Sequence, residues 1–289
     1  MKRALAGLIT MAVVATASAG DAKIVFLAGS PSHGPGEHEH RAGCLLLQGC
    51  LDKVPGVTSE VYSNGWPQNP AAAFAGVATL VVYSDGGPGH PLLRDDHLKM
   101  VGALMRKGVG LVCIHYAVEP TKEAGEKEFL DWIGGCFETD WSVNPTWLAE
   151  FKPMPTHAIT RGVNPLRITD EWYFHMRFRE SMKGVLPILS AVPPASTMDR
   201  ADGPHEGNPA VREAVRRGEP EIVAWACERT DGGRGFGFTG GHYHRNWGND
   251  DFRKLVLNAI LWTAKVEVPA GGVECKITEE DLKRNLDRK

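Results

Sequence analysis

Short apolar runs alternate with amphipathic stretches along the first half of the chain. Most of the runs are apolar throughout and end at a small or polar residue, which is typical of strands buried on both faces of a parallel sheet. The stretches between them repeat apolar residues at helical spacing. This pattern predicts strands at residues 23–29, 57–62, 79–84 and 108–115, and helices at 41–54 and 94–107.

The second half of the chain is less regular. Its pattern predicts strands at residues 185–192, 222–227 and 234–239, with the last two in hairpin-like order, and helices at 129–137, 250–263 and 278–287. Residues 140–147 are aromatic and resemble a loop, whereas residues 168–173 favour an edge strand. Proline and charged residues are frequent in residues 193–220, which predicts a long surface loop.

Strands and helices that alternate at this spacing predict an α/β fold, with a mostly parallel sheet between two helical layers. A length of 289 residues fits two domains at most, or one large α/β domain. The 43% hydrophobic and 23% charged residues exclude a disordered chain. The net charge of −3 gives no basic excess, so no nucleic-acid partner is expected.

The first residues have the features of a secretory signal peptide. Lys2 and Arg3 precede an apolar run at residues 4–16, which is too short to span a bilayer, and Ala17 and Ala19 form a small-x-small cleavage pattern. We expect cleavage after Ala19; the alternative is an N-terminal membrane anchor. No later stretch is apolar enough to span a bilayer, so we expect a periplasmic or secreted protein without stable membrane insertion. All six cysteines lie after this segment, and their pairing stays open.

Histidines follow four of the predicted strands. Ligands of open parallel sheets bind beyond the carboxyl ends of the strands, and the loops there hold His33, His38 and His40, then His90, then His115, and finally His242 and His244. A lone histidine is usually structural. Histidines in four loops at one edge of the sheet predict a shared functional pocket.

Two of these loops resemble the active site of class I glutamine amidotransferases. Residues 85–89 (DGGPG) resemble their oxyanion loop, residues 112–117 (VCIHYA) resemble their nucleophile elbow, and His242 lies where their catalytic histidine follows a strand. The elbow differs at its centre, because His115 stands where those enzymes have cysteine and Cys113 falls inside the strand. Glutaminase activity is therefore not expected.

The chain as a whole resembles the trehalose-utilisation (ThuA-like) family, which shares the three-layer flavodoxin-like, class I glutamine amidotransferase-like sandwich. The matching segments are Ser32-His33-Gly34, Gly86-Gly87, Ile114-His115, Gly135-Cys136-Phe137, residues 157–162, Asp170-Glu171-Trp172-Tyr173, and Gly240-Gly241-His242 with Trp247. The resemblance implies a role in carbohydrate metabolism, often beside oxidoreductases that make 3-keto sugars. It implies a ThuA-like domain at residues 20–268, followed by a polar tail at 269–289.

Four residues are the catalytic candidates. His115, at the predicted tight turn, is our choice of general base or metal ligand, with Glu119, Asp85 and His242 assisting. For His115 the alternative is a bond to a neighbouring loop. For Glu119 it is a charge that stabilises a helix N-terminus.

A zinc site is a second hypothesis for the same loops. His242 and His244 point to one side if their segment is extended, and His33 or His115 would complete the ligand set. His38 and His40 belong to such a cluster or to the start of the first helix. No further motif such as His-Glu-x-x-His accompanies them, so the sequence leaves the metal open.

Polar and aromatic residues near these loops are candidates for binding a sugar. They are His33, Gly86, Gly87, Asp140, Trp141, His175, His244 and Trp247. Trp141 and Trp247 have polar neighbours and are expected to be exposed platforms, and the N–H groups of Gly86 and Gly87 are expected near a developing enolate oxygen. Asp170 and Glu171 are expected either to act as a general acid and base or to hold His175 in position.

Two functional classes remain for a small-molecule carbohydrate ligand. The first is an enzyme that cleaves or isomerises a trehalose-type or 3-keto glycoside by acid/base chemistry, or a metal-dependent sugar hydrolase. The second is a non-catalytic sugar-binding protein. Several titratable groups in one place favour the enzyme.

Overall fold

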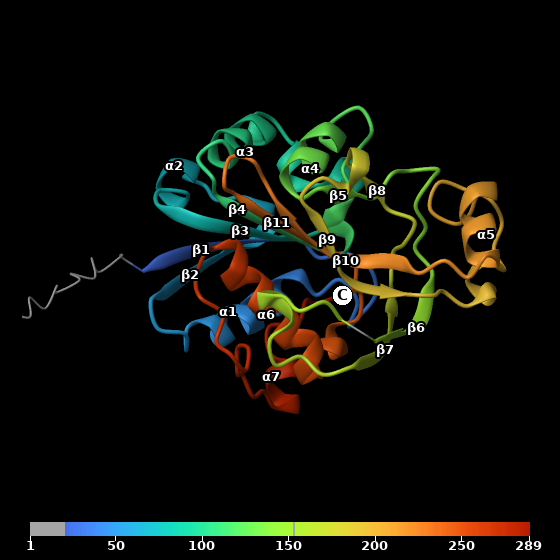
Figure 1. The fold of residues 1–289 in the computed structure, drawn as a ribbon. Helices are drawn as coiled ribbons and strands as arrows, with labels where there is room; N and C mark the ends of the chain where they lie inside the picture. The colour runs from blue at the N-terminus through green and yellow to red at the C-terminus, as the bar shows by residue number, and fades with distance from the viewer. Residues whose placement is uncertain (1–20, 153) are drawn as a thin grey trace, which may run out of the picture.

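The computed structural model describes residues 21–152 and 154–289, which are built around a seven-stranded sheet (Figure 1). In spatial order its strands are β2 (Val57–Tyr62), β1 (Ala22–Ala28), β3 (Val77–Tyr83), β4 (Gly110–Ile114), β11 (Arg234–Phe238), β10 (Glu221–Glu228) and β9 (Val185–Ala191). The first five are parallel, whereas β10 is antiparallel to both β11 and β9. The predicted mostly parallel sheet and the β10–β11 hairpin are confirmed. The predicted signal peptide lies outside the described residues.

Helices cover both faces of this sheet. The helices of the described residues are α1 (His40–Leu51), α2 (Pro70–Ala73), α3 (His97–Met105), α4 (Glu126–Trp132), α5 (Pro209–Arg216), α6 (Asp250–Thr263) and α7 (Glu279–Lys283). Figure 1 shows α2, α3 and α4 on one face, and α1 and α6 on the other. Along β1, Ile24 and Phe26 pack toward α1 and α6, while Val25 and Leu27 pack toward the opposite layer. This confirms the expected three-layer, flavodoxin-like sandwich.

The prediction of one long loop at residues 193–220 is wrong, because α5 occupies part of it. Asn208 is the N-cap and its side chain accepts a hydrogen bond from the N–H of Val211. Pro209 fits the first helical position, where no N–H is needed. The prolines that indicated a loop therefore include one that begins a helix.

Two further boundaries differ from the prediction. The helix expected at residues 129–137 ends at Trp132, because Gly134 takes a left-handed φ of 83° and the chain enters β5 (Gly135–Cys136), which pairs with β8 (Arg177–Phe178). The loop expected at residues 140–147 gives way to β6 (Thr146–Phe151). β6 pairs antiparallel with β7 (Leu166–Glu171), and together they form a two-stranded sheet beside the main one.

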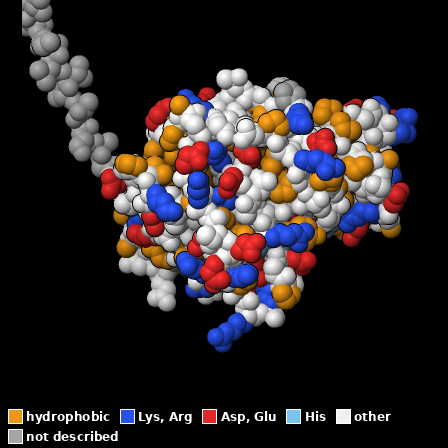
Figure 2. Space-filling model, turned by 90° about the horizontal axis from the view of Figure 1, so that it is seen from below, with side chains coloured by type: hydrophobic (Ala, Val, Ile, Leu, Met, Phe, Trp, Pro, Cys, Tyr) orange, Lys and Arg blue, Asp and Glu red, His pale blue; other side chains and the backbone are white. Residues whose placement is uncertain are grey.

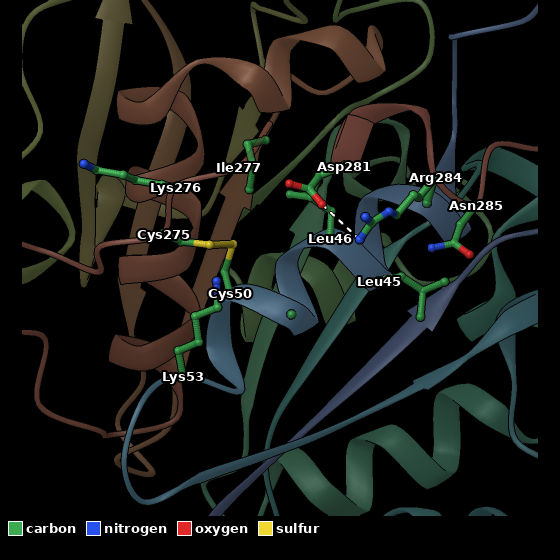
Figure 3. Close-up of a pocket in the computed structure, with 12 residues that line it drawn as sticks. Leu45, Leu46, Cys50, Lys53, Cys275, Lys276, Ile277, Asp281, Arg284 and Asn285 are labelled. Carbon is green, nitrogen blue, oxygen red and sulfur yellow. Dashed lines mark ion pairs between the residues drawn. A yellow bond between two sulfur atoms is a disulfide. The ribbon is translucent and has the colours of Figure 1, made fainter. Parts of the chain in front are cut away.

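The C-terminal segment is fastened to the sandwich by a disulfide bond. Cys50 of α1 is bonded to Cys275. Figure 3 shows this bond, with Asp281 and Arg284 further along the segment facing α1. The backbone N–H of Asp287 donates to Glu39 at 2.7 Å, so the chain end also contacts the loop between β1 and α1. The other four cysteines are buried and free.

Acidic and basic side chains are interspersed over the face that Figure 2 shows. Among residues 21–152 and 154–289, no helix combines the length and the apolar character that crossing a membrane requires.

Candidate functional site

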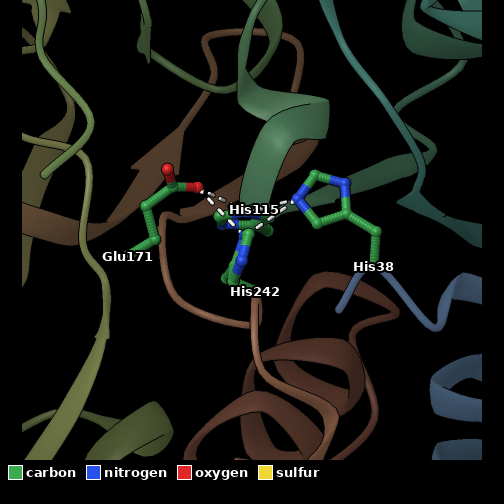
Figure 4. A group of neighbouring side chains, drawn as sticks. All are labelled: His38, His115, Glu171 and His242. Carbon is green, nitrogen blue, oxygen red and sulfur yellow. Dashed lines mark hydrogen bonds and ion pairs between the residues drawn. The ribbon is translucent and has the colours of Figure 1, made fainter. Parts of the chain in front are cut away.

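Four side chains from separate segments meet beyond the carboxyl ends of the central strands (Figure 4). His38 comes from the loop after β1, His115 follows β4 directly, His242 follows β11, and Glu171 ends β7. One ligand atom from each lies within 4.8 Å of the other three. We call these four residues the histidine–carboxylate cluster. The structure thus brings together His115 and His242, as expected from their positions after the carboxyl ends of parallel strands.

The contacts within the histidine–carboxylate cluster are short. The Nε2 atom of His38 lies 3.0 Å from Nδ1 of His242 and 3.1 Å from Nε2 of His115. The Oε2 atom of Glu171 lies 3.1 Å from Nδ1 of His242 and 3.4 Å from Nε2 of His115. The hydroxyl of Tyr173 lies 3.3 Å from the same His115 nitrogen. One atom from each of the four cluster residues therefore faces one common point, with the Tyr173 hydroxyl beside it.

The backbone at the turns holds these side chains in place. His115 has a φ of 57° and His38 a φ of 44°, conformations that non-glycine residues rarely adopt. At His115 the chain leaves β4 for a single 3₁₀ turn, His115–Val118. A Cβ at Gly86 would overlap the backbone oxygen of Tyr116, so only glycine allows the two loops to approach this closely. The strained turn resembles a nucleophile elbow with histidine at its tip.

Asp170 positions the loop that carries His242. Its carboxylate is fully buried and accepts hydrogen bonds from the N–H groups of Gly241 at 2.8 Å and His242 at 3.1 Å, and from the side chain of Asn246 at 3.0 Å. The hypothesis that Asp170 and Glu171 form an acid and base, or fix His175, is corrected by these contacts. Asp170 is structural, and Glu171 belongs to the histidine–carboxylate cluster.

Burial and the neighbouring charges shift the pKa values of the cluster. Burial, together with the neighbouring His115, lowers the pKa of His38 far below its usual value. Burial raises the pKa of Glu171, but hydrogen bonds with His115 and His242 outweigh it and hold the pKa well below its usual range. Burial lowers the pKa of His242, yet the Glu171 carboxylate raises it to a net value above the ordinary one. The site therefore contains an ionised Glu171 beside a neutral His38.

The candidates at the solvent side of the cluster are His33 and Asp85. His33 stacks on His38 with ring centroids 3.6 Å apart, and its side chain is 41% exposed. Asp85 accepts a hydrogen bond from Ser32 and lies 2.8 Å from Nδ1 of His38. His115 is fully buried. The residue expected as general base or metal ligand therefore lies inside a buried cluster and not on an exposed pocket wall.

Glu119 forms a separate pair with His205, which the sequence analysis did not identify. Oε1 of Glu119 lies 2.9 Å from Nε2 of His205, and Oε2 is buried without a hydrogen-bond partner among the described residues. Burial raises the pKa of Glu119, whereas the His205 hydrogen bond lowers it; the net shift is upward. The same bond raises the pKa of His205. His205 lies between the predicted strands in a stretch without periodicity, so no pattern indicated it.

Tyr116 connects this pair to the histidine–carboxylate cluster. A Cβ at Gly87 would lie 3.6 Å from both the Tyr116 hydroxyl and Oε1 of Glu119, so these two groups face the same point. The Tyr116 ring centroid is 6.1 Å from that of His38. The N–H of Gly87 donates to the backbone oxygen of Glu119 at 2.9 Å. It is therefore not free to stabilise an enolate oxygen, which corrects that part of the prediction.

Two other candidates are wrong in their placement. Trp247 is fully buried and packs against Tyr83 and Phe252, so it is a core residue and not an exposed platform. His244 begins the 3₁₀ turn His244–Gly248, so the chain is not extended there and His242 and His244 do not share a side. His244 is buried outside both groups of metal-type ligands found in the described residues.

The remaining candidates form a separate group. Trp141 is half-buried and stacks on His175 at 4.3 Å, and the exposed Asp140 donates its N–H to the backbone of Pro204. His175 bonds to Glu221 through its backbone N–H. In the hydrogen bonds of the described residues, none of these three contacts the histidine–carboxylate cluster.

Comparisons with known proteins agree with this architecture. No curated protein matches the chain. A crystal structure of a ThuA-like protein from Bacteroides uniformis superposes with a TM-score of 0.59 at 14% identity, covering 86% of this chain and 93% of the other. A ThuA-like protein from Parabacteroides merdae gives a TM-score of 0.54 at 13% identity, covering 89% and 93%. These two show a shared fold. The family model ThuA, described as trehalose utilisation, matches residues 56–263, well over half of the chain, and the protein therefore belongs to the ThuA family.

Proposed function

We propose that this protein is an enzyme of carbohydrate metabolism that acts on a trehalose-type or 3-keto glycoside at the histidine–carboxylate cluster. The observation that carries this proposal is the meeting of three imidazoles and one carboxylate at the carboxyl ends of the central strands. Membership of the trehalose-utilisation family supports a sugar as the substrate.

The burial of the cluster favours catalysis over simple sugar binding. A binding protein needs polar groups and apolar platforms that the sugar can touch. His38 and His115 are fully buried, and burying polar groups costs free energy that contact with a sugar would not recover. Of the two expected platforms, Trp247 lies in the core, and Trp141 makes no hydrogen bond to the cluster among the described residues. A concentration of titratable groups that costs free energy to bury is typical of an active site.

Proton transfer is the chemical step that we assign to the site. A 3-keto group acidifies the adjacent C–H of the sugar, so a well-placed base can begin cleavage or isomerisation. Glu119, bonded to His205, is our choice for the group that exchanges a proton with the sugar. Glutamine hydrolysis is not proposed, because Cys113 lies inside β4 and burial raises the pKa of its thiol.

An assay with purified full-length mature protein tests this function. Trehalose, its 3-keto derivative and a simple glucoside are each incubated with the enzyme and followed by NMR. We expect the oxidised glycoside to be consumed, and His115→Ala to slow this reaction because it removes one imidazole of the histidine–carboxylate cluster. His97→Ala is the matched control, because His97 stacks on Trp66 outside the cluster. Binding of every sugar without turnover would identify a binding protein instead.

We also propose that the chain is exported, with cleavage after Ala19. The Cys50–Cys275 disulfide fits an oxidising compartment. Intact-mass analysis of protein from its native host should show Gly20 as the first residue, and a mass two hydrogen atoms below that of the reduced chain. A chain that retains Met1, with both cysteines reduced, would contradict export.

A further inference from the structure

We propose that the histidine–carboxylate cluster binds one divalent transition-metal ion of the zinc type. The four ligand atoms are Nε2 of His38, Nε2 of His115, Nδ1 of His242 and Oε2 of Glu171. This ligand set differs from the one expected from sequence, since His38 and Glu171 replace His33 and His244.

The outer hydrogen bonds fix where two imidazoles carry their protons. Nδ1 of His38 lies 2.8 Å from the carboxylate of Asp85, and Nδ1 of His115 lies 2.8 Å from the backbone oxygen of Thr239. Both oxygens can only accept a hydrogen bond, so each Nδ1 carries the proton. In a neutral imidazole the other nitrogen, Nε2, is then a bare lone pair.

These two bare nitrogens face each other. Nε2 of His38 and Nε2 of His115 are 3.1 Å apart, and while both rings are neutral neither of these two nitrogens can donate a proton to the other. A proton on Nδ1 of His242 can be donated to His38 or to Glu171, but it leaves the contact between His38 and His115 unsatisfied. A cation at the common point satisfies all four atoms together.

The separations of the ligand atoms fit a small cation. Of the six separations among the four ligand atoms, four span 3.0 to 3.4 Å and all lie within 4.8 Å. Tetrahedral zinc with bonds of about 2.0–2.1 Å requires ligand atoms about 3.3 Å apart. A donor set of three imidazoles and one carboxylate suits zinc or a neighbouring transition metal, whereas magnesium and calcium prefer oxygen ligands.

The surroundings complete the pattern of a metal centre. Asp85 and the Thr239 backbone oxygen orient two of the imidazoles, and Oε1 of Glu37 lies 3.6 Å from Nε2 of His242. Acceptors behind metal-binding histidines fix the tautomer and increase the basicity of the ligand. Glu171 remains 18% exposed, so the metal would be approached from its side. If the proposed sugar function holds, the ion would polarise an oxygen of the substrate, and His115 would be a ligand.

Metal titration of the chelator-treated, full-length mature protein tests this proposal without any sugar. Calorimetry should show one Zn²⁺ per chain and no comparable binding of Mg²⁺, and Co²⁺ should give the visible absorption of a low-symmetry site with nitrogen ligands. His38→Ala and Glu171→Gln should each weaken Zn²⁺ binding by about 10²-fold or more. His97→Ala is the matched control, because His97 stacks on Trp66 and supplies none of the four ligand atoms.

The possible results separate the metal from the function. Loss of Zn²⁺ binding in both ligand variants, with binding by His97→Ala unchanged, supports the site. If His38→Ala does not fold, Glu171→Gln decides. The metal-site proposal is overturned if the wild type does not bind one Zn²⁺ per chain, or if both ligand variants bind Zn²⁺ as tightly as the wild type. A protein that consumes the sugar without binding metal would keep the proposed function and reject the cofactor. A protein that binds metal but turns over no sugar would keep the metal site and reject the proposed function.

Discussion

Replacement of Asp170 by alanine should lower the free energy of unfolding by about 3 kcal/mol or more and abolish turnover. The fully buried carboxylate accepts hydrogen bonds from the backbone N–H groups of Glu171, Gly241 and His242, and from the side chain of Asn246. Each bond to a charged acceptor contributes about 1.5–3 kcal/mol, and alanine would leave several buried donors without a partner. Two cluster residues, Glu171 and His242, would lose their backbone anchor together.

Denaturant unfolding measures the first effect and the carbohydrate assay measures the second. Asp251→Ala is the matched control, since Asp251 also accepts a hydrogen bond from a backbone N–H, that of Asn164, but at an exposed position. Its unfolding free energy should change by less than about 1 kcal/mol. If Asp170→Ala unfolds within about 1 kcal/mol of the wild type, the assigned role of Asp170 in positioning the loop is wrong.

The centre of the sheet was predictable because β1, β3 and β4 are buried on both faces. The apolar runs of these three strands must pack against two helical layers, and this leaves a continuous hydrophobic signal in the sequence. The strand-end rule then predicted that His115 and His242 would meet, because the carboxyl ends of parallel strands lie at one edge. Neither inference required knowledge of contacts between distant segments.

The complete cluster was not predictable in the same way. His33 and His38 lie in one loop and His40 begins α1, and no local pattern distinguishes His38 as the one that joins the cluster. Glu171 ends β7 in the separate two-stranded sheet. The local sequence contains no pattern that shows where this sheet packs against the main one. Contacts that depend on tertiary packing therefore supplied half of the cluster.

Trp247 was misplaced for a related physical reason. Its neighbours Asn246 and Gly248 are polar or small, which is typical of an exposed turn. The 3₁₀ turn His244–Gly248 instead folds back on α6, and the indole enters the core against Phe252. The helix α5, in contrast, could have been predicted, because Asn-Pro at residues 208–209 is a typical start of a helix.

Replacement of Glu119 by glutamine should reduce sugar turnover by about 10²–10⁴-fold while stability and Zn²⁺ binding stay close to those of the wild type. An amide oxygen can still accept the hydrogen bond from Nε2 of His205, but the amide cannot take up a proton. The Glu119 side chain is only 3% exposed, and burial raises its pKa. A carboxyl with a raised pKa is well matched to proton exchange near neutral pH. Glu150→Gln, at an exposed ion pair on β6, is the control and should retain full activity.

His205→Ala gives an independent test through the pH profile. The His205 hydrogen bond lowers the pKa of Glu119, so its removal should raise that pKa further. If Glu119 acts as a base, it must be ionised, and the rising limb of activity should then move to higher pH. A shift to lower pH, or full activity in Glu119→Gln, would contradict this assignment. Unchanged Zn²⁺ affinity in both variants would place the loss in proton transfer, because neither residue contributes one of the four proposed ligand atoms.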